Sequence, residues 1–416
     1  MKRIIILLIA IHGMSALPLP AQTPEQNLQK YWNYRERLRK YFIAVSPSDE
    51  QGANIPASSI GGSKYDDFYT GDGNGTMQYY IGVLATEYRL LRLHGLNYTQ
   101  TRNELLYALR AVERLDRKAE RYFRSPQQEH SGDLNGFFIR DDVDESIKLI
   151  NNNLGDFGIL STFLTHTNNG VQKPYEQSKD NVWHYLLNLA LVKGLVDDSE
   201  IVGIAQSIAA RMVSHMHHTD WVELPYCCPP GLKKYYNPCW RIINPVTGAD
   251  VEDGARVDEI GWCQASIDGF NYGFAEAAGW ITGQDLHYGE SEEKEGAFIN
   301  GLTFGVSHQG TILYLWDSYS YRSLAATMGL EINQSLYQYL VNRSYLHYPY
   351  EHLALIYVLL HGKPSDFTDL FTTEFNRYEH LLNVAPLCGT YNFGSNVTFN
   401  GLQLSLIHIS EPTRPY

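Results

Sequence analysis

The chain has 416 residues, of which 44% are hydrophobic, and a formal net charge of −13 at pH 7. An acidic chain without basic runs argues against nucleic acid as the main partner. The apolar run at 4–11 is shorter than the roughly 20 residues that span a bilayer, and no later run is long enough. These observations argue against nucleic acid as the main partner and against a membrane-spanning domain after the first apolar run.

The first 21 residues have the pattern of a secretory signal peptide. Lys2 and Arg3 form a positive n-region, 4–11 is the apolar h-region, and the small residue Ala21 precedes Gln22. We therefore predict cleavage after Ala21 and a secreted or periplasmic domain over 22–403. A membrane anchor is the alternative, which the shortness of the apolar run disfavours.

Helical periodicity begins after this leader. An amphipathic helix is predicted over 23–42, followed by a long Gly-rich segment, 43–75. The next predicted helix, 76–95, is capped by Thr76 and ended by Gly95, and a further helix spans 99–120. The three-residue link between them makes the two helices an antiparallel hairpin.

A second predicted hairpin follows the long, mostly irregular segment 121–177. It consists of helices 178–196 and 199–215 with a very short turn between them. The second half of helix 178–196 is apolar nearly all round, so other elements must cover it on all sides. Its start is polar, because Ser178 is a good N-cap and Asp180 lies in the first turn, where free N–H groups stabilise an acidic side chain. This pattern predicts an inner helix with a polar mouth at its N-terminal end.

The remaining sequence is predicted to be helical again after a loop, 219–260, that is rich in Pro and Cys. Helices are expected at 264–283 and near 320–330, 334–341, 349–361 and 366–382, with a short strand hairpin around 301–316. In an oxidising compartment Cys239 can bridge to Cys227 or Cys228. Segment 404–414 reads LSLIHISEPTR and resembles a translated sequencing adapter. We therefore expect 404–416 to be a non-native tail and the natural chain to continue beyond Gln403.

The recurring unit is a helix, a short turn, a second helix and a long loop, which predicts an all-α fold of stacked hairpins. Closed into a ring, such hairpins form an (α/α) toroid with the inner-helix N-termini and the long loops on one face. The segments DGNGTMQYYIGVLATEYRLL, EQSKDNVWHYLLNLALV and GFAEAAGWITG resemble the six-hairpin superfamily of carbohydrate-active enzymes and secreted Bacteroidetes-type proteins of glycan-use systems. The resemblance covers about 28–382. It implies a toroid that acts on oligosaccharides, as a glycoside hydrolase or a polysaccharide lyase, and the adapter-like tail implies that this toroid is C-terminally truncated.

Glycoside hydrolysis requires two carboxyl groups that flank one bond. Asp180 is the first candidate, as acid/base or as the group that orients the attacking water, because it lies at the predicted mouth. Candidates for the second carboxylate are Asp66 and Asp67 in the Gly-rich segment, then Asp142 and Asp156. The alternative for Asp180 is a first-turn helix carboxylate, and for the others a solvated loop acid or a local cap.

Sugar rings have apolar faces that stack on aromatic side chains, and Tyr69, Tyr175 and Trp183 are candidates for such a platform. Packing in the core is the alternative for Trp183, since it lies in the apolar part of its helix.

A polysaccharide lyase would instead need a base and positive charge near a uronate, for which Lys179, Arg140 and His184 are candidates. The net acidity of the chain disfavours a polyanionic substrate. A non-catalytic glycan-binding or surface structural protein on the same scaffold is the alternative of a different class.

No cofactor or metal is predicted. Ca²⁺ is the alternative, because the run Asp141, Asp142, Asp144 and Glu145 offers hard oxygen ligands, although its spacing does not match an EF-hand. The cluster His215, His217 and His218 closes a predicted helix and has no acidic or Cys partner at zinc spacing.

Overall fold

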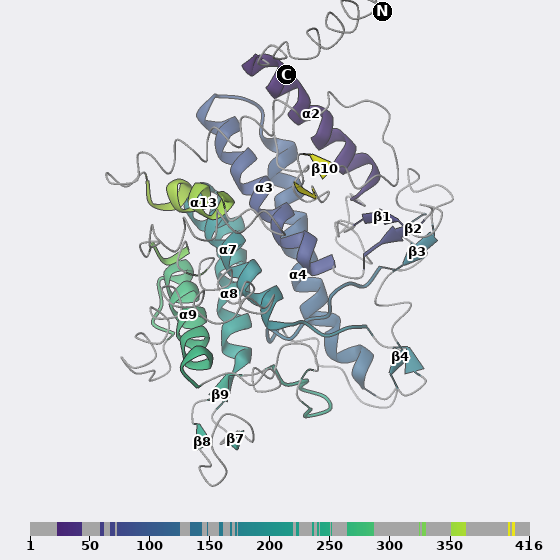
Figure 1. Ribbon diagram of the computed structural model, residues 1–416, viewed down its shortest axis with the longest axis vertical. Coiled ribbons are helices and arrows are strands. Elements are labelled where there is room, and N and C mark those ends of the chain that lie inside the picture. The colour runs from purple at the N-terminus through teal and green to yellow at the C-terminus, as the bar shows by residue number, and fades with distance from the viewer. Residues whose placement is uncertain are drawn as a thin grey trace, which may run out of the picture.

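The computed structural model describes residues 23–43, 59–61, 67–70, 73–124, 134–143, 148, 158–160, 167–168, 171–172, 174–218, 222–223, 235–236, 239–240, 242–249, 251, 264–286, 324, 327–329, 351–362, 398–399 and 402–403. This part of the chain is mostly helical, as predicted (Figure 1). None of its helices is long and apolar enough to cross a membrane. The predicted signal peptide, the hairpin around 301–316 and the helices at 334–341 and 366–382 lie outside the described residues.

The helices are α2 (Pro24–Tyr41), α3 (Gly73–Leu93), α4 (Thr99–Phe123), α7 (Lys179–Leu195), α8 (Ser199–Met216), α9 (Gln264–Thr282) and α13 (Glu351–His361). Both predicted hairpins are present, as α3–α4 and α7–α8. Gly95 follows the end of α3, in the turn of the first hairpin, and its positive φ of 65° is a conformation that favours glycine. The predicted start of α3 at Thr76 is wrong, because the helix begins at Gly73 despite the low helix propensity of glycine.

Short strands lie between the helices and after α13. In one three-stranded sheet, β1 (Ser59–Gly61) pairs antiparallel with β2 (Asp67–Tyr69), which pairs in parallel with β3 (Gly158–Leu160). The others form two-residue pairs: β4 (Thr167–Asn168) with β5 (Val171–Gln172), β6 (His217–His218) with β9 (Cys239–Trp240), β7 (Val222–Glu223) with β8 (Tyr235–Tyr236), and β10 (Thr398–Phe399) with β11 (Leu402–Gln403). The first sheet joins the segment before α3 to the long segment before α7.

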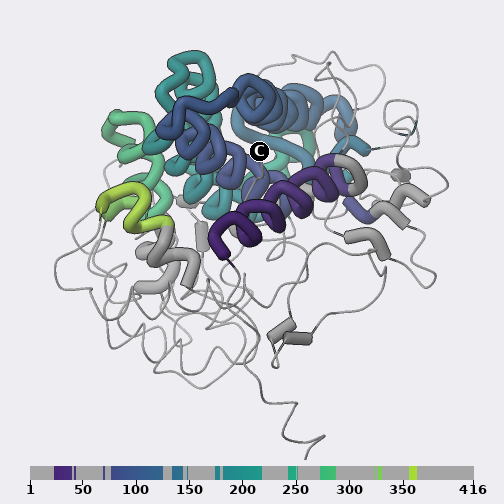
Figure 2. Tube along the Cα trace, turned by 90° about the horizontal axis from the view of Figure 1, so that it is seen from above, coloured from purple at the N-terminus to yellow at the C-terminus, as the bar shows by residue number. Residues whose placement is uncertain are grey.

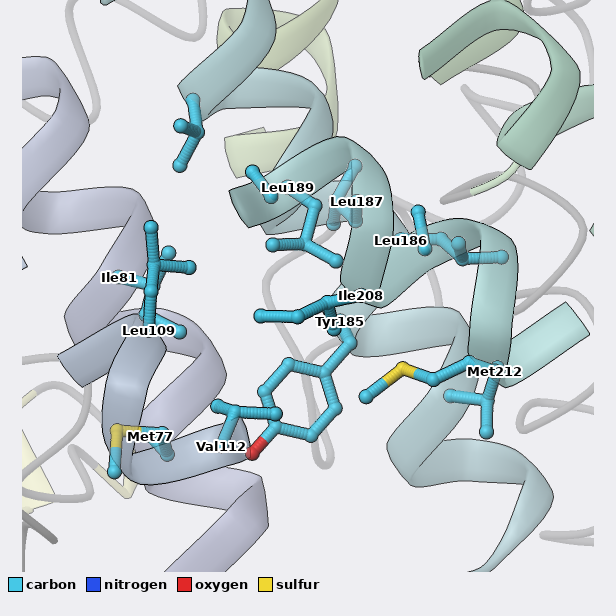
Figure 3. Close-up of a cluster of buried hydrophobic side chains, with 14 of the residues drawn as sticks. Met77, Ile81, Leu109, Val112, Tyr185, Leu186, Leu187, Leu189, Ile208 and Met212 are labelled. Atoms are coloured by element: carbon cyan, nitrogen blue, oxygen red, sulfur yellow. The ribbon is translucent and has the colours of Figure 1, made fainter. Parts of the chain in front are cut away.

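Helix α7 is at the centre of the core, as its apolar sequence predicts. It packs against α3, α8, α9 and α13, and from Asn181 to Val192 every side chain is buried, apart from that of His184, which is partly buried. Figure 3 shows Tyr185 of α7 pointing toward Val112 of α4, with Met77 of α3 beyond it, and all three side chains are buried. Because α7 has apolar side chains all round, it can serve as the shared core of several helices.

Helices α3 and α7 run parallel. The rings of Tyr79 and His184 lie 5.6 Å apart, Gly82 faces Asn188 further along, and the Tyr88 hydroxyl donates to Asp197 at 2.7 Å beyond the end of α7. In these three contacts the residue numbers increase along both helices, which is possible only if the two helices run in the same direction. Consequently the N-terminal ends of α3 and α7 lie at the same end of the bundle.

The outer helices α4 and α8 are also parallel to each other, since Arg102 pairs with Asp198 at 2.6 Å and Glu113 with Arg211 at 3.1 Å. Helix α9 runs in the direction of α7, because the ring centroid of Trp280, near the C-terminal end of α9, lies 4.2 Å from the Lys193 ammonium near the end of α7. Two hairpins and a third helix are therefore stacked in register, which is the repeating relation of a helical-hairpin fold.

Helix α2 crosses the bundle obliquely (Figure 2) and is attached by buried ions. Arg35 pairs with Glu87 of α3 at 3.0 Å and with Glu104 of α4 at 2.5 Å, and all three side chains are buried. Tyr31 and Tyr80 donate hydroxyl groups to these carboxylates at 2.6 and 2.8 Å. The carboxylates have charged and hydroxyl partners, as buried acids require.

Candidate functional site

The N-terminal end of α7 is reached by an extended segment that pairs with a second stretch of chain. The Arg140 N–H donates to the Tyr175 carbonyl at 2.9 Å, and the Gln177 N–H donates to the Phe138 carbonyl at 3.0 Å. The buried Gln177 side chain continues this pairing, since Nε2 donates to the Gly136 carbonyl at 3.0 Å and Oε1 accepts from the Phe138 N–H. Segment 174–178 is therefore fixed relative to 136–140.

Two of the predicted substrate-binding residues meet on this paired segment. The Arg140 guanidinium lies 5.1 Å from the ring centroid of Tyr175, and its Nε donates to the Glu176 carbonyl at 3.0 Å. Tyr175 is 38% exposed, so part of its side chain faces solvent. A cation over an aromatic ring fixes the ring plane. The result is an oriented, solvent-facing aromatic surface directly before α7.

The turn at 242–249 contacts the segment directly before the N-terminal end of α7. Asn244 donates through Nδ2 to the Glu176 carboxylate at 2.7 Å, and its Oδ1 accepts the backbone N–H groups of Val246 and Thr247 at 2.9 and 3.2 Å. Asn244 is buried, so this contact ties a third loop to the start of α7.

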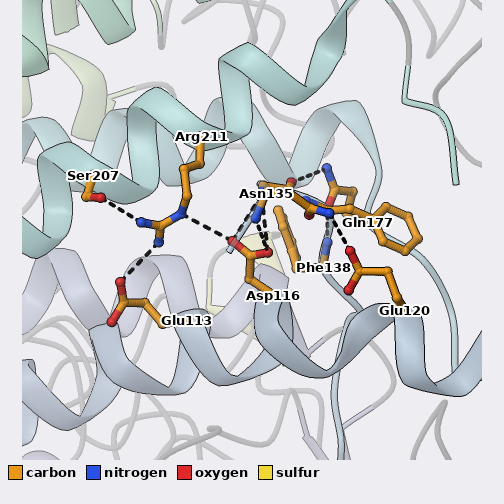
Figure 4. A network of polar contacts seen from close by, with 10 residues as sticks. Glu113, Asp116, Glu120, Asn135, Phe138, Gln177, Ser207 and Arg211 are labelled. Atoms are coloured by element: carbon orange, nitrogen blue, oxygen red, sulfur yellow. Dashed lines mark hydrogen bonds and ion pairs between the residues drawn. The ribbon is translucent and has the colours of Figure 1, made fainter. Parts of the chain in front are cut away.

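A polar network beneath 134–138 holds this loop on α4 and α8 (Figure 4). The Asp116 carboxylate accepts the N–H groups of Asn135 at 3.0 Å and Gly136 at 3.1 Å, and it contacts Arg211 Nε at 3.3 Å. Burial raises the pKa of Asp116 to about 6, although these partners lower it. Gly136 has a φ of +86°, and a Cβ there would overlap the Arg211 carbonyl oxygen. The loop can therefore lie directly on α8 only with glycine at this position.

Asp142, a predicted second carboxylate, is already paired. Both of its oxygens accept from the Arg114 guanidinium, at 2.8 and 2.9 Å, and both side chains are buried. A bidentate buried pair of this kind neutralises the carboxylate and fixes its orientation. The geometry thus assigns Asp142 to the attachment of the loop on α4. Neither of its carboxylate oxygens is left without a partner for acid/base catalysis.

The structure brings some of the other predicted residues to the same end of the bundle. Asp67 and Tyr69 belong to β2, in register with Gly158 and Leu160 of β3, and the chain then enters α3. Asp180 and Lys179 open α7. Since α3 and α7 are parallel, both segments approach the bundle from one side. Asp66, Asp156 and the side chains of Asp67, Lys179 and Asp180 lie outside the described residues.

Ser178 precedes α7 as predicted, and its N–H donates to Asn181 Oδ1 at 3.3 Å in a capping arrangement. Trp183 is only 7% exposed and belongs to the core cluster, which matches the packing alternative. Burial lowers the pKa of His184 to about 3, so its ring is neutral at physiological pH and provides no positive charge for a uronate.

Sequence reasoning missed several polar groups near this end, above all Gln78 and Thr70, which are fully buried. The only signal was a Gln between apolar neighbours in TMQYYIG. In the part of the chain that the structure describes, no group of three or more His, Cys, Asp or Glu side chains is placed to hold a metal ion.

No protein-family model matches the sequence, and neither the curated proteins nor the solved structures contain a significant match.

Proposed function

We propose that this protein is a secreted carbohydrate-active protein of the (α/α) toroid type, which binds oligosaccharides and hydrolyses a glycosidic bond at the N-terminal ends of α3 and α7. The observation that carries the proposal is the parallel course of these two helices. It directs the segments that contain Asp67 and Asp180 to the same end of the bundle, as a reaction with two carboxyl groups requires. Further hairpins that continue this parallel stacking would close the ring.

In this proposal Asp180 is the acid/base, or orients the attacking water, and Asp67 is the second carboxylate. The start of a helix is a favourable place for an ionised carboxylate, because free N–H groups and the helix dipole stabilise it. Asp142 has no catalytic role, since Arg114 holds both of its oxygens. Separation of the two carboxyl groups would decide between retention and inversion at the sugar.

The exposed ring of Tyr175 provides the surface on which a sugar face would stack, and Arg140 holds this ring in place. This surface does not depend on either proposed catalytic carboxylate. It therefore also supports the second candidate function, oligosaccharide binding without hydrolysis.

The test is Asp180→Asn, assayed for both turnover and binding with an oligosaccharide panel. We expect turnover to fall by about 10²–10⁴, the usual contribution of an acid/base group, while binding is retained. Tyr175→Ala should weaken binding about tenfold, at the upper end of the energy of an aromatic contact.

Asp198→Asn is the matched control, because Asp198 caps α8 at the opposite end of the bundle and accepts the Glu200 and Ile201 N–H groups at 3.1 and 3.2 Å. It should leave turnover unchanged. Binding by the wild type without turnover would select the non-catalytic function, and products that absorb in the ultraviolet would identify a lyase. Neither binding nor turnover with any oligosaccharide would refute the proposal.

A further inference from the structure

Gln78 differs from most of the buried polar side chains that the structure describes, because both of its polar atoms are unpaired. Its side chain is fully buried on α3, and neither Nε2 nor Oε1 has a hydrogen-bond partner. The equally buried Gln177 shows the usual arrangement, with its donor on Gly136 and its acceptor filled by Phe138. An amide that is buried without partners lowers stability, so its retention needs an explanation.

The position of Gln78 along α3 directs it toward the first turns of α7. Gly82, one turn further along the same face, is opposite Asn188 of α7, and the neighbouring Tyr79 contacts the His184 ring. Since the two helices are parallel, Gln78 lies one turn closer than Gly82 to the end where α7 begins. Since helical side chains lean toward the N-terminus of their helix, Gln78 lies at the level of the first turns of α7, near the end at which Tyr175 and Asp180 are located.

A second polar side chain in the same state precedes α3. Thr70 is fully buried directly after β2, and its hydroxyl oxygen has no hydrogen-bond partner. Two unsatisfied neutral groups thus border the entry to α3. Together they offer donors and acceptors but no charge.

We propose that Gln78, with Thr70, is the group that recognises sugar hydroxyls in the site, and that the substrate is accordingly a neutral sugar rather than a uronate. This inference rests on the proposed function. An amide donates to one hydroxyl and accepts from another, which suits the alternating donors and acceptors of a pyranose edge. The neutral His184 ring nearby, whose charged form burial disfavours, suits an uncharged ligand as well.

Gln78→Met tests the inference, because methionine keeps the length of the side chain and removes the amide. The variant should unfold at a higher temperature than the wild type, since an unpaired buried amide is lost. Titration calorimetry with cellotriose and maltotriose should show affinity at least about tenfold weaker for whichever sugar binds the wild type. A trigalacturonide should bind no better than these neutral sugars.

Gln206→Met is the matched control, because Gln206 is on α8 and its Nε2 is bonded to the Ile281 carbonyl at 3.0 Å. Its affinity should equal that of the wild type. If the wild type binds a sugar and Gln78→Met binds it equally well, this inference fails while the proposed function stands. Lower thermal stability of Gln78→Met would also overturn it, since the amide would then be bonded in the free protein. Failure of all probes to bind the wild type would refute the proposed function and this inference together.

Discussion

Gly82→Ala tests the close approach of α3 and α7, on which the parallel arrangement depends. A Cβ at Gly82 would overlap Asn188 Oδ1 and lie 3.0 Å from Asn188 Cγ and 3.2 Å from Leu191 Cδ1. Asn188 is buried and cannot easily move, because its Nδ2 donates to the His184 carbonyl at 2.9 Å. The substitution therefore forces atoms together in a closely packed interface.

Two opposing effects determine how much Gly82→Ala changes the free energy of unfolding. Alanine in a helix interior is favoured over glycine by about 1 kcal/mol. Overpacking a core costs about 1–3 kcal/mol, and displacement of Asn188 would add about 1 kcal/mol for the lost hydrogen bond. We expect Gly82→Ala to lower the free energy of unfolding by about 1–3 kcal/mol, measured by urea denaturation.

A double-mutant cycle with Asn188→Ala isolates the cause. In that background the overlapping oxygen is absent, so Gly82→Ala should cost little or stabilise the protein. Gly203→Ala is the matched control, because Gly203 is exposed on α8 and a Cβ there meets nothing within 4 Å. It should stabilise by about 1 kcal/mol or less. An equal effect of Gly82→Ala in both backgrounds would refute the argument from close packing.

Two further predictions concern the loop that presents Arg140. Asp142→Asn should lower the free energy of unfolding by about 3–5 kcal/mol, because the buried Arg114 loses its counter-charge; unchanged stability in urea would contradict this. Asp116→Asn should change the pH dependence of stability. The pKa of Asp116 in the folded protein, about 6, is above its ordinary value of 3.8. Protonation of Asp116 therefore stabilises the fold fully below about pH 4, and this stabilisation is lost as the pH rises through 6. Between pH 7 and 4 the wild type should therefore gain about 1–3 kcal/mol of stability relative to Asp116→Asn, and parallel pH profiles would contradict the raised pKa.

The sequence contained enough information to predict the two hairpins α3–α4 and α7–α8. The apolar second half of α7 required burial on all sides, and the short links at Gly95 and Asp197 required hairpins. Both follow from local periodicity and chain connectivity, which a single sequence shows directly. The start of α3 was harder, because the residues before Thr76 have poor helix propensity and the helix includes Gly73 all the same.

The candidate site was less predictable, because its decisive contacts link distant positions. Asp142 looked like a free acid in an acidic run, yet Arg114, 28 residues earlier, fills both of its oxygens. The bonds of Asp116 to the 134–138 loop and the unpaired state of Gln78 have no local pattern either. Whether a buried polar group is satisfied depends on its three-dimensional neighbours, and these are not given by hydrophobic periodicity.

The attachment of α2 has a consequence for assembly. During synthesis α2 emerges from the ribosome before the two helices that it binds, but Arg35 requires Glu87 and Glu104, which follow it by 52 and 69 residues. The two carboxylates lie close enough to bind the guanidinium together only when α3 and α4 have paired. Contacts between residues this far apart in the sequence form slowly. Helix α2 is therefore made before the hairpin on which it docks, and its ion pairs can form only after α3 and α4 have been made and paired.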